Sequence, residues 1–305
     1  MYDIIIIGAG PAGMTAGIYA RRAKKKVLIL EKASYGGQII TADDIENFPT
    51  YTHISGFDFA TNLYNQVKEL GAEILFEKVI DIKNYDDHKE VITTNNTYNS
   101  QTIIVATGAD NRKLGLDNED ALTGKGISYC ATCDGAFYKD KIVAVNGGGN
   151  TAIEDALYLS NLVKKIYLIH RRDTFRADEI LLNKLKEKSN IEFILNSKIT
   201  KINGTQKLES IDISNDKETT NLKIDGLFIA IGRNPENQNF ANIIDLDEKG
   251  YVKALENCHT NVQGIYAAGD NRIKDLRQLV TATSDGAVAA TEAIKYINEM
   301  RSKNV

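Results

Sequence analysis

The fold of this chain is decided by residues 3–13, which read DIIIIGAGPAG. The run of isoleucines is short, continuous and aliphatic, which is typical of a strand covered on both faces. The glycines that follow permit a tight turn, close approach of the backbone to a pyrophosphate and close packing of the next helix. We therefore predict a dinucleotide-binding turn between a strand and a helix. Its candidate cofactor-binding residues are Gly8, Gly10, Pro11, Ala12 and Gly13.

The residues after this turn complete a β-α-β unit. We predict a helix over residues 14–23 and a second buried strand over residues 27–30, which read VLIL. Glu31 closes that strand about 20 residues beyond the glycines, where a carboxylate accepts hydrogen bonds from ribose hydroxyls. The N-terminus of the predicted helix favours the negative charge of the phosphates.

The same pattern returns in the middle of the chain. Residues 141–145 read KIVAV and residues 147–152 read GGGNTA, followed by a predicted helix and a strand over residues 166–169. One glycine-rich turn is a weak signal, but two turns in full β-α-β context indicate an α/β chain with two Rossmann-like nucleotide-binding domains. The candidate residues of the second turn are Gly147, Gly149, Asn150, Thr151 and Ala152.

The second unit ends differently from the first, because residues 170–176 read HRRDTFR. A guanidinium suits the 2′-phosphate of NADP(H), whereas a carboxylate at this place would repel it. We predict a phosphate-binding site here, and the plain alternative is a solvated basic start of a helix. The candidate residues are His170, Arg171, Arg172 and Arg176.

Between the two turns, residues 130–135 read CATCDG. Cys130 and Cys133 are spaced for reversible disulfide chemistry, and a helix N-terminus at this place would favour a thiolate. The alternative is half of a zinc site completed by Cys258 and His259, since three cysteines and a histidine are an accepted ligand set. We expect no metal, because a second closely spaced pair is missing. Asp134 either handles a proton of this chemistry or caps the following turn.

Composition limits the remaining classes of function. The chain has 305 residues, 43% of them hydrophobic and 26% charged, with a formal net charge of −4. About 150 residues per domain predicts two folded domains, and the slight negative charge favours neither nucleic acid nor a membrane as the main partner. We find no export signal, and therefore expect a cytoplasmic protein. The charged runs at residues 21–26 and 184–188 are expected to stay solvated.

In addition, the sequence resembles the low-molecular-weight, bacterial-type thioredoxin reductases over essentially its whole length. Each matching motif is modest alone, but their order along the chain is specific. The motifs are GAGPAG at 8–13, GGQ at 36–38, IENFP at 45–49, CATCDG at 130–135, GGGNTA at 147–152, HRRDTFRA at 170–177, AAGD at 267–270 and LRQ at 276–278.

This resemblance implies FAD in the first fold and NADPH in the second, with the NADPH domain inserted into the FAD domain. The implied domains are residues 1–113 and 243–305 for FAD and residues 114–242 for NADPH and the cysteine pair. The family also implies a homodimer. Asn146 and Asn271 stand where the family usually has aliphatic residues. These departures do not change which cofactors are implied, but they leave the detailed contacts to the cofactors less well defined. The further residues implied to contact FAD are Gly36, Gly37, Gln38, Asn47, Gly269, Asp270, Arg277 and Gln278.

The resemblance also implies roles for the cysteine pair. Cys133 would face the flavin, Cys130 would attack the disulfide of an oxidised thioredoxin, and Asp134 would supply or take the proton. Because the cysteines and the nicotinamide site share the inserted domain, a domain rotation is expected to bring each to the flavin in turn. The rivals are a dithiol oxidase that uses oxygen, a reductase fed by ferredoxin, a peroxide-system flavoprotein and a non-catalytic sensor with zinc.

Overall fold

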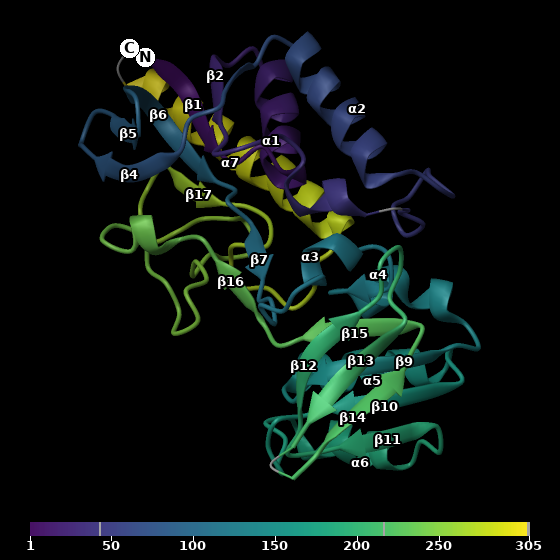
Figure 1. The fold of residues 1–305 in the computed structure, drawn as a ribbon. Helices are drawn as coiled ribbons and strands as arrows, with labels where there is room; N and C mark the ends of the chain where they lie inside the picture. Colours follow the sequence, from purple (N-terminus) through teal and green to yellow (C-terminus); the bar gives the residue numbers. More distant parts are fainter. Residues whose placement is uncertain (43, 216, 304–305) are drawn as a thin grey trace. The chain divides into compact units, whose positions relative to one another are not determined.

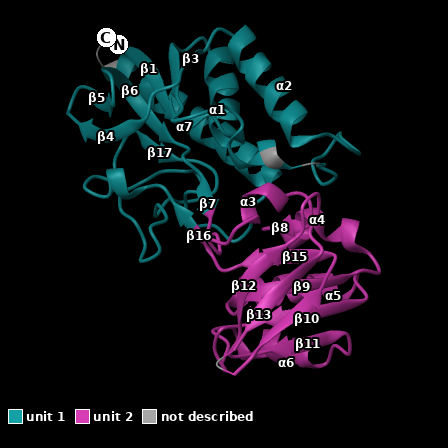
Figure 2. Ribbon diagram, in the orientation of Figure 1, with its two compact units in different colours: residues 1–110, 234–305 teal, residues 111–233 magenta. Residues whose placement is uncertain are grey.

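The computed structural model describes residues 1–42, 44–215 and 217–303. Within them the chain divides into two compact units, unit 1 (Met1–Asp110 and Asn234–Val305) and unit 2 (Asn111–Arg233), coloured separately in Figure 2. Unit 2 is therefore an insertion in unit 1, with bounds at residues 111 and 233 beside the expected 114 and 242. The last two residues of the expected third segment lie outside the described residues.

Unit 1 contains a sheet in the order β3-β2-β1-β6-β5-β4, with β17 paired to β6 (Figure 1). The strands are parallel from β3 to β6 and at β17, whereas β4 and β5 form an antiparallel extension. Its strands are β1 (Tyr2–Ile7), β2 (Val27–Leu30), β3 (Glu73–Leu75), β4 (Val79–Asn84), β5 (Lys89–Thr93), β6 (Thr97–Val105) and β17 (Ile265–Ala267). Its helices are α1 (Pro11–Arg22), α2 (Gly56–Glu69) and α7 (Leu279–Lys303), with 3-10 turns η1 (Gly37–Thr41) and η3 (Gln238–Phe240).

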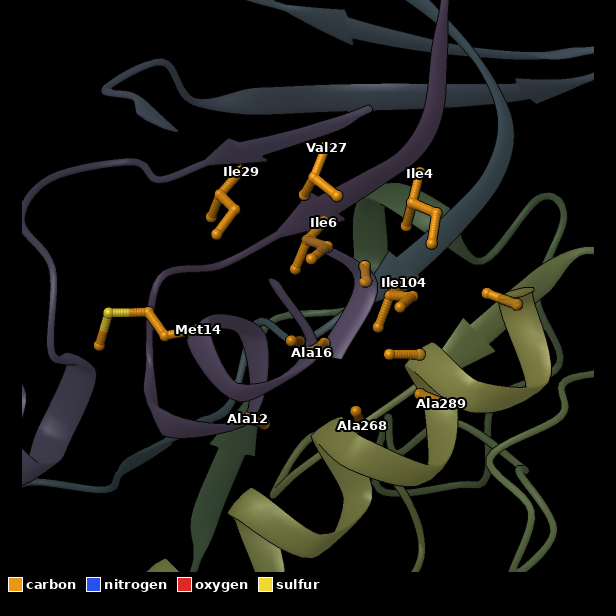
Figure 3. Packing of buried hydrophobic residues seen from close by; sticks show 14 of the residues in the cluster. Ile4, Ile6, Ala12, Met14, Ala16, Val27, Ile29, Ile104, Ala268 and Ala289 are labelled. Atoms are coloured by element: carbon orange, nitrogen blue, oxygen red, sulfur yellow. The ribbon is translucent and has the colours of Figure 1, made fainter. Parts of the chain in front are cut away.

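Alternate residues of β1 face opposite sides of this sheet, as the pleat of a strand requires. Ile4 and Ile6 pack with Met14 of α1 and with alanines of α7, an arrangement visible in Figure 3. Ile5 and Ile7 face the other side and pack in a separate cluster with Phe240. Burial of each such side chain contributes roughly 1.5–3 kcal/mol, which explains why the isoleucine run forms the central strand.

Helices α1 and α7 approach each other closely because small residues line their contact. The buried alanines are Ala12, Ala16 and Ala20 on α1 and Ala289, Ala290 and Ala293 on α7. A Cβ on Gly286 of α7 would lie 2.2 Å from the carbonyl oxygen of Ala12. The start of α7 is thereby held against the N-terminal turn of α1.

Unit 2 repeats the arrangement with a parallel sheet in the order β11-β10-β9-β15-β8. Val143 and Val145 of its central strand pack against α5, whereas Ala144 faces the cluster formed with the antiparallel sheet β12-β13-β14. Its strands are β8 (Ile127–Ser128), β9 (Ile142–Gly147), β10 (Lys165–Ile169), β11 (Ile191–Ile194), β12 (Lys198–Asn203), β13 (Ser210–Ser214), β14 (Thr219–Lys223) and β15 (Gly226–Ala230). Its helices are α3 (Glu119–Leu122), α4 (Ala131–Asp134), α5 (Asn150–Ser160) and α6 (Glu179–Lys186), with the 3-10 turn η2 (Gly135–Tyr138).

The chain enters and leaves unit 2 at neighbouring positions. Strands β7 (Ala109–Asn111) and β16 (Arg233–Pro235), which contain the two crossings, pair with each other. Within unit 2, the N–H of Arg112 donates a 3.0 Å hydrogen bond to the carbonyl oxygen of Gly232.

The predicted α/β class with two Rossmann-like folds is confirmed. The helices and strands predicted from the sequence differ from the observed ones mainly at their ends. Helix α1 begins at Pro11, three residues before the predicted start, because proline suits the first position of a helix. The expectation of a solvated run at residues 21–26 is wrong at Lys25, which is 6% exposed and donates a hydrogen bond to Asn298. Among the described residues, no helix is both long enough and apolar enough to cross a membrane.

Candidate active site

The turn between β1 and α1 consists of glycines because backbone atoms surround it closely. Gly8 has a φ of +112°, and a Cβ there would lie 2.3 Å from the carbonyl oxygen of Ala106. A Cβ on Gly13 would lie 1.9 Å from the carbonyl oxygen of Gly8. By contrast, a Cβ on Gly10 would meet nothing within 4 Å in the described part of the chain.

Gly10 is also the N-cap of α1, and no side chain caps this helix end. The first N–H groups of α1 therefore have no intrahelical acceptors, while Pro11 lacks an N–H altogether. Gly37 adds a second backbone at this place, since a Cβ built on it would lie 3.4 Å from the Cα of Gly10. An open glycine cradle beside an uncapped helix N-terminus fits the pyrophosphate of a dinucleotide.

Glu31 lies directly after β2, beside this cradle. Its Oε2 accepts a 2.8 Å hydrogen bond from the N–H of Ala9 and its Oε1 accepts one of 3.1 Å from the N–H of Ala33. The residue is 9% exposed. These bonds fix the orientation of the carboxylate and leave lone pairs for the hydroxyls of a ribose.

The expected FAD contacts that lie far apart in sequence are brought together within unit 1. Asn47 donates a 3.2 Å hydrogen bond from Nδ2 to Oε1 of Gln278. Gln38 donates from Nε2 to the carbonyl oxygen of Ala109 at 2.5 Å. Gly36 has a φ of +101° and starts the 3-10 turn η1, which carries Gly37 and Gln38.

The expected C-terminal FAD contacts lie on the loop between β17 and α7. Gly269 has a φ of +88°, and the Nε of Arg277 donates a 3.4 Å hydrogen bond to the carbonyl oxygen of Asp270. The guanidinium of Arg277 lies 4.3 Å from the ring centroid of Tyr251. Asn271, one of the two departures from the motif, is fully buried and donates from Nδ2 to the carbonyl oxygen of Val105 at 3.0 Å. Its side chain therefore holds the loop to β6.

The turn of unit 2 has the same construction. Gly149 is the uncapped N-cap of α5, and a Cβ on it would meet nothing within 4 Å among the described residues. A Cβ on Gly147 would lie 2.4 Å from the carbonyl oxygen of Ala230. Asn150 and Asp178 exchange two hydrogen bonds of 3.0 Å, from Asn150 Nδ2 to Asp178 Oδ2 and from the Asp178 N–H to Asn150 Oδ1. This exchange ties the start of α5 to the start of α6.

The basic segment 170–176 folds back on this turn. The N–H of Arg176 donates a 2.7 Å hydrogen bond to the carbonyl oxygen of Gly148. The ring of His170 stacks on Phe175 at 5.2 Å, and its Nε2 lies 3.1 Å from the carbonyl oxygen of Thr174. Burial, together with the nearby guanidiniums, lowers the pKa of His170. The segment thus presents a neutral imidazole and several arginines next to a dinucleotide turn.

Cys130 and Cys133 form a disulfide at the N-terminus of α4, with Cys130 as its N-cap. The Cys130 N–H donates a 3.0 Å hydrogen bond to Oγ of Ser128, and that hydroxyl donates one of 2.6 Å to Oδ2 of Asp134. The Asp134 N–H in turn donates to the carbonyl oxygen of Cys130 at 3.1 Å. A carboxylate is thereby held beside the disulfide through one hydroxyl group.

A family model described as pyridine nucleotide-disulphide oxidoreductase matches residues 2–286. The chain belongs to this family. Membership implies a flavin and a pyridine nucleotide, and members are flavin-dependent disulfide reductases. This oxidoreductase carries its disulfide in unit 2, at the N-terminus of α4.

Curated relatives have the same extent as this chain. A thioredoxin reductase of Listeria innocua is 40% identical over 304 residues, covering 99% of this chain and 95% of the relative. The thioredoxin reductase of Bacillus subtilis is 38% identical over 304 residues, covering 99% and 96%. The crystal structure of thioredoxin reductase from Streptococcus pyogenes matches with a TM-score of 0.94 at 40% identity, covering 98% of this chain and 99% of that one. The resemblance to this group is confirmed.

The structure does not support the alternative of a zinc site formed by Cys130, Cys133, Cys258 and His259. Cys130 and Cys133 are joined as a disulfide, and zinc requires thiolates. Cys258 is fully buried, donates from Sγ to the carbonyl oxygen of Asp285 at 3.6 Å, and has a pKa raised to about 12, chiefly by burial. His259 instead pairs through Nε2 with Glu292 at 2.8 Å.

Sequence reasoning missed two residues of this oxidoreductase. Ser128 precedes Cys130 by two positions, a spacing at which a hydroxyl accepts from the backbone, and this signal was available. Asp285 binds the loop of Gly269 from the first turns of α7, and no local pattern points to it. Its contacts form only when segments distant in sequence fold together.

Proposed function

We propose that this oxidoreductase is an NADPH-dependent thioredoxin-disulfide reductase. Two electrons pass from NADPH through FAD to the Cys130–Cys133 disulfide and from there to the disulfide of an oxidised thioredoxin. The observation that carries the proposal is the disulfide itself, placed at a helix N-terminus with Ser128 and Asp134 bonded around it. The curated relatives named thioredoxin reductase support the choice of acceptor.

In this proposal unit 1 holds FAD. The open cradle at Gly10 and Gly37 receives the pyrophosphate, and Glu31 receives the ribose. FAD, when bound, supplies a relay that takes a hydride and passes on an electron pair. The remaining contacts are proposed for the 36–47 and 269–278 segments, which are joined through Asn47 and Gln278.

Unit 2 holds NADPH. The uncapped start of α5 receives the pyrophosphate, and the arginines of the 170–176 segment bind the 2′-phosphate. The hydrogen bond from Arg176 to Gly148 supports this preference, because it keeps the basic segment beside the turn. A neutral His170 adds no further charge, and because its Nε2–H donates to the carbonyl oxygen of Thr174, its Nδ1 is left as a hydrogen-bond acceptor.

Thiol–disulfide exchange carries the electron pair from the Cys130–Cys133 pair to thioredoxin. An electron pair breaks the S–S bond and leaves two thiolates, of which at least one takes a proton. The Cys130 thiolate attacks one sulfur of the thioredoxin disulfide, which forms a mixed disulfide and releases the other sulfur as a thiolate. Cys133 then attacks Sγ of Cys130, so that the ring closes and thioredoxin leaves as a dithiol. Asp134 moves the protons at these sulfurs, held in place by Ser128.

An anaerobic titration of the purified protein with NADPH tests the proposal. The flavin absorption band should bleach, and oxidised thioredoxin added afterwards should restore it. Bleaching without recovery would exclude thioredoxin as acceptor. A flavin that NADPH does not bleach would exclude NADPH as donor, and a colourless protein that does not take up FAD would exclude the whole relay.

Two cysteine variants sharpen this titration. Cys130→Ser should keep bleaching by NADPH and lose thioredoxin reduction, because the attacking sulfur is gone. Cys258→Ala is the matched control, since this buried thiol lies outside the proposed relay, and it should keep both steps. Equal thioredoxin reduction by Cys130→Ser and the parent protein would contradict the assignment.

The proposal includes a homodimer and a cytoplasmic location, supported by the resemblance to the bacterial-type reductases. Light scattering of the purified protein should give twice the 33.7 kDa mass of the chain. A monomer that still reduces thioredoxin would remove the dimer from the proposal. Fractionation of the source cells tests the location.

A further inference from the structure

A buried carboxylate on α7 binds the loop that carries the proposed C-terminal FAD contacts. Asp285 is 6% exposed. Its Oδ2 accepts from the N–H of Gly269 at 2.9 Å, from Nε of Arg272 at 2.9 Å and from Nζ of Lys274 at 2.8 Å. Its Oδ1 accepts from Nη2 of Arg272 at 2.9 Å. One side chain thus accepts three hydrogen bonds from two charged side chains and one from a backbone N–H, all within residues 269–274.

The partners of Asp285 are buried as deeply as the carboxylate. The Arg272 side chain is 4% exposed and the Lys274 side chain is 7% exposed. Two cations at such positions require a counter-charge, because an unpaired buried charge is strongly unfavourable. Burial would raise the pKa of Asp285, but the hydrogen bonds from Arg272 and Lys274 hold it below its ordinary value. The carboxylate is therefore ionised at neutral pH.

Further hydrogen bonds extend this cluster through the loop. The Nη2 of Arg277 donates to the carbonyl oxygen of Arg272 at 3.2 Å, and its Nε donates to that of Asp270. Gly269 has a φ of +88°, a conformation that its bond to Asp285 helps to hold. The backbone of Asp270 consequently lies between Gly269 and Arg272, and both of these residues are held by hydrogen bonds to Asp285.

Asp285 is itself fixed in space by the packing of α7. The next residue, Gly286, touches the backbone of Ala12 so closely that a Cβ would lie 2.2 Å from its carbonyl oxygen. Ala12 belongs to the first turn of α1, at the glycine cradle. The packing of Gly286 against Ala12 thus fixes the position of the Asp285 carboxylate relative to the glycine cradle, which is the other proposed FAD-binding segment of unit 1.

We propose that Asp285 is a positioning residue for FAD binding. It holds the 269–278 loop in its position relative to the glycine cradle before the cofactor binds. Asp285 itself does not contact the cofactor in this proposal. A preset loop lowers the ordering cost of binding, so that loss of the carboxylate weakens FAD binding. The inference rests on the proposed function, since it assigns FAD to unit 1.

The test compares three variants as apoproteins. Asp285→Asn keeps the shape and removes the charge, Asp285→Glu keeps the charge, and Glu292→Gln changes a carboxylate on the same helix that pairs with His259 instead of the loop. The equilibrium dissociation constant for FAD is measured by fluorescence titration, normalised to the folded fraction. Hydrogen exchange of the amides of residues 269–278 is measured without FAD.

Asp285→Asn should weaken FAD binding about tenfold or more and speed exchange in the loop. Asp285→Glu should recover part of the affinity, whereas Glu292→Gln should match the parent protein. NADPH binding to unit 2 should stay unchanged in all three. If Asp285→Asn does not fold, Lys274→Met removes one of the donors and should weaken FAD binding in the same direction.

An FAD dissociation constant of Asp285→Asn within twofold of the parent value, with lower stability alone, would overturn the inference and leave the proposed function intact. A parent protein that takes up no FAD would overturn both.

Discussion

The hydroxyl group of Ser128 lies between the backbone of Cys130 and the carboxylate of Asp134. It accepts a 3.0 Å hydrogen bond from the Cys130 N–H and donates one of 2.6 Å to Oδ2 of Asp134. The side chain is buried, because Ser128 is 4% exposed. One small residue therefore couples the position of the proposed proton carrier to that of the attacking cysteine.

Replacement of Ser128 by alanine should slow the disulfide exchange with thioredoxin. Loss of a hydrogen bond to a charged group costs roughly 1.5 kcal/mol, which corresponds to about a tenfold lower rate. Stopped-flow measurement should show this loss in the thioredoxin half-reaction and an unchanged rate of flavin reduction by NADPH. Ser160→Ala is a matched control, since within the described residues that hydroxyl bonds only to the helix carbonyl of Leu157. An exchange rate in Ser128→Ala equal to that of the control would remove Ser128 from the mechanism.

Replacement of Arg171, Arg172 and Arg176 by alanine should change the preference between the two nicotinamide cofactors. Removal of each phosphate-binding guanidinium should weaken NADPH binding about tenfold, with little effect on NADH, which lacks the 2′-phosphate. Dissociation constants for both cofactors are measured by titration. Lys184→Ala on α6 controls for a general loss of positive charge. A parallel loss for both cofactors would mean that these arginines do not bind the 2′-phosphate.

A different pattern is expected when Asn150 is replaced by alanine. This change removes both hydrogen bonds with Asp178, which orient the start of α5 where the pyrophosphate is proposed to bind. NADPH and NADH should therefore weaken equally, by about 1 kcal/mol or roughly fivefold. The same titrations measure it, and selective loss of NADPH would contradict this role for the pair.

The stability of the apoprotein should depend on Asp285 at acid pH. Its pKa in the folded protein is lowered from the ordinary value of 3.8 by the bonds from Arg272 and Lys274, which outweigh the opposing effect of burial. A carboxyl with a lowered folded pKa contributes stability above its unfolded pKa and loses it as the pH falls through the folded value. Urea unfolding of the parent protein should thus lose stability below about pH 4.

The corresponding measurement on Asp285→Asn provides the control. This variant should be less stable than the parent protein at pH 7 and should converge toward it as the solution becomes acid. A constant difference between the two proteins from pH 7 to the acid transition would show that the charge of Asp285 does not contribute.

Replacement of Thr50 by glycine should stabilise the protein. Thr50 is exposed and has a φ of +85°, a region that strongly disfavours a β-branched residue. Relief of this strain should raise the free energy of unfolding by about 1 kcal/mol, measured by chemical denaturation. Thr52→Gly, two residues away and outside the left-handed region, should instead be neutral or destabilising. No gain in Thr50→Gly would mean that the neighbouring loop relaxes the strain.

Local patterns predicted the parts of this molecule that depend on neighbours in sequence. The run from Ile4 to Ile7 and the glycines after it specify strand, turn and helix within about a dozen residues. The second turn, at Gly147, is equally local. The ends of helices were predicted less accurately. A helix such as α1 starts where its first residues can adopt helical backbone angles, and Pro11 can do so.

The long-range contacts of the candidate site could not be predicted in this way. Asn47 meets Gln278 only because the chain leaves unit 1 and returns to it. The bond from Gly269 to Asp285 likewise depends on the packing of α7. The resemblance to known reductases indicated these residues as a group, whereas their partners are set by the tertiary structure.

The paired ends of unit 2 have a consequence for how such a chain can be built and rebuilt. The bond between Arg112 and Gly232, each one residue inside an end of unit 2, brings the two ends of the unit together, so the unit has the adjacent termini of an independent domain. The remaining chain likewise needs only a short bridge from Asp110 to Asn234. The core clusters of unit 1 contain only residues of unit 1, so we expect that unit 2 can be exchanged between relatives without altering that core.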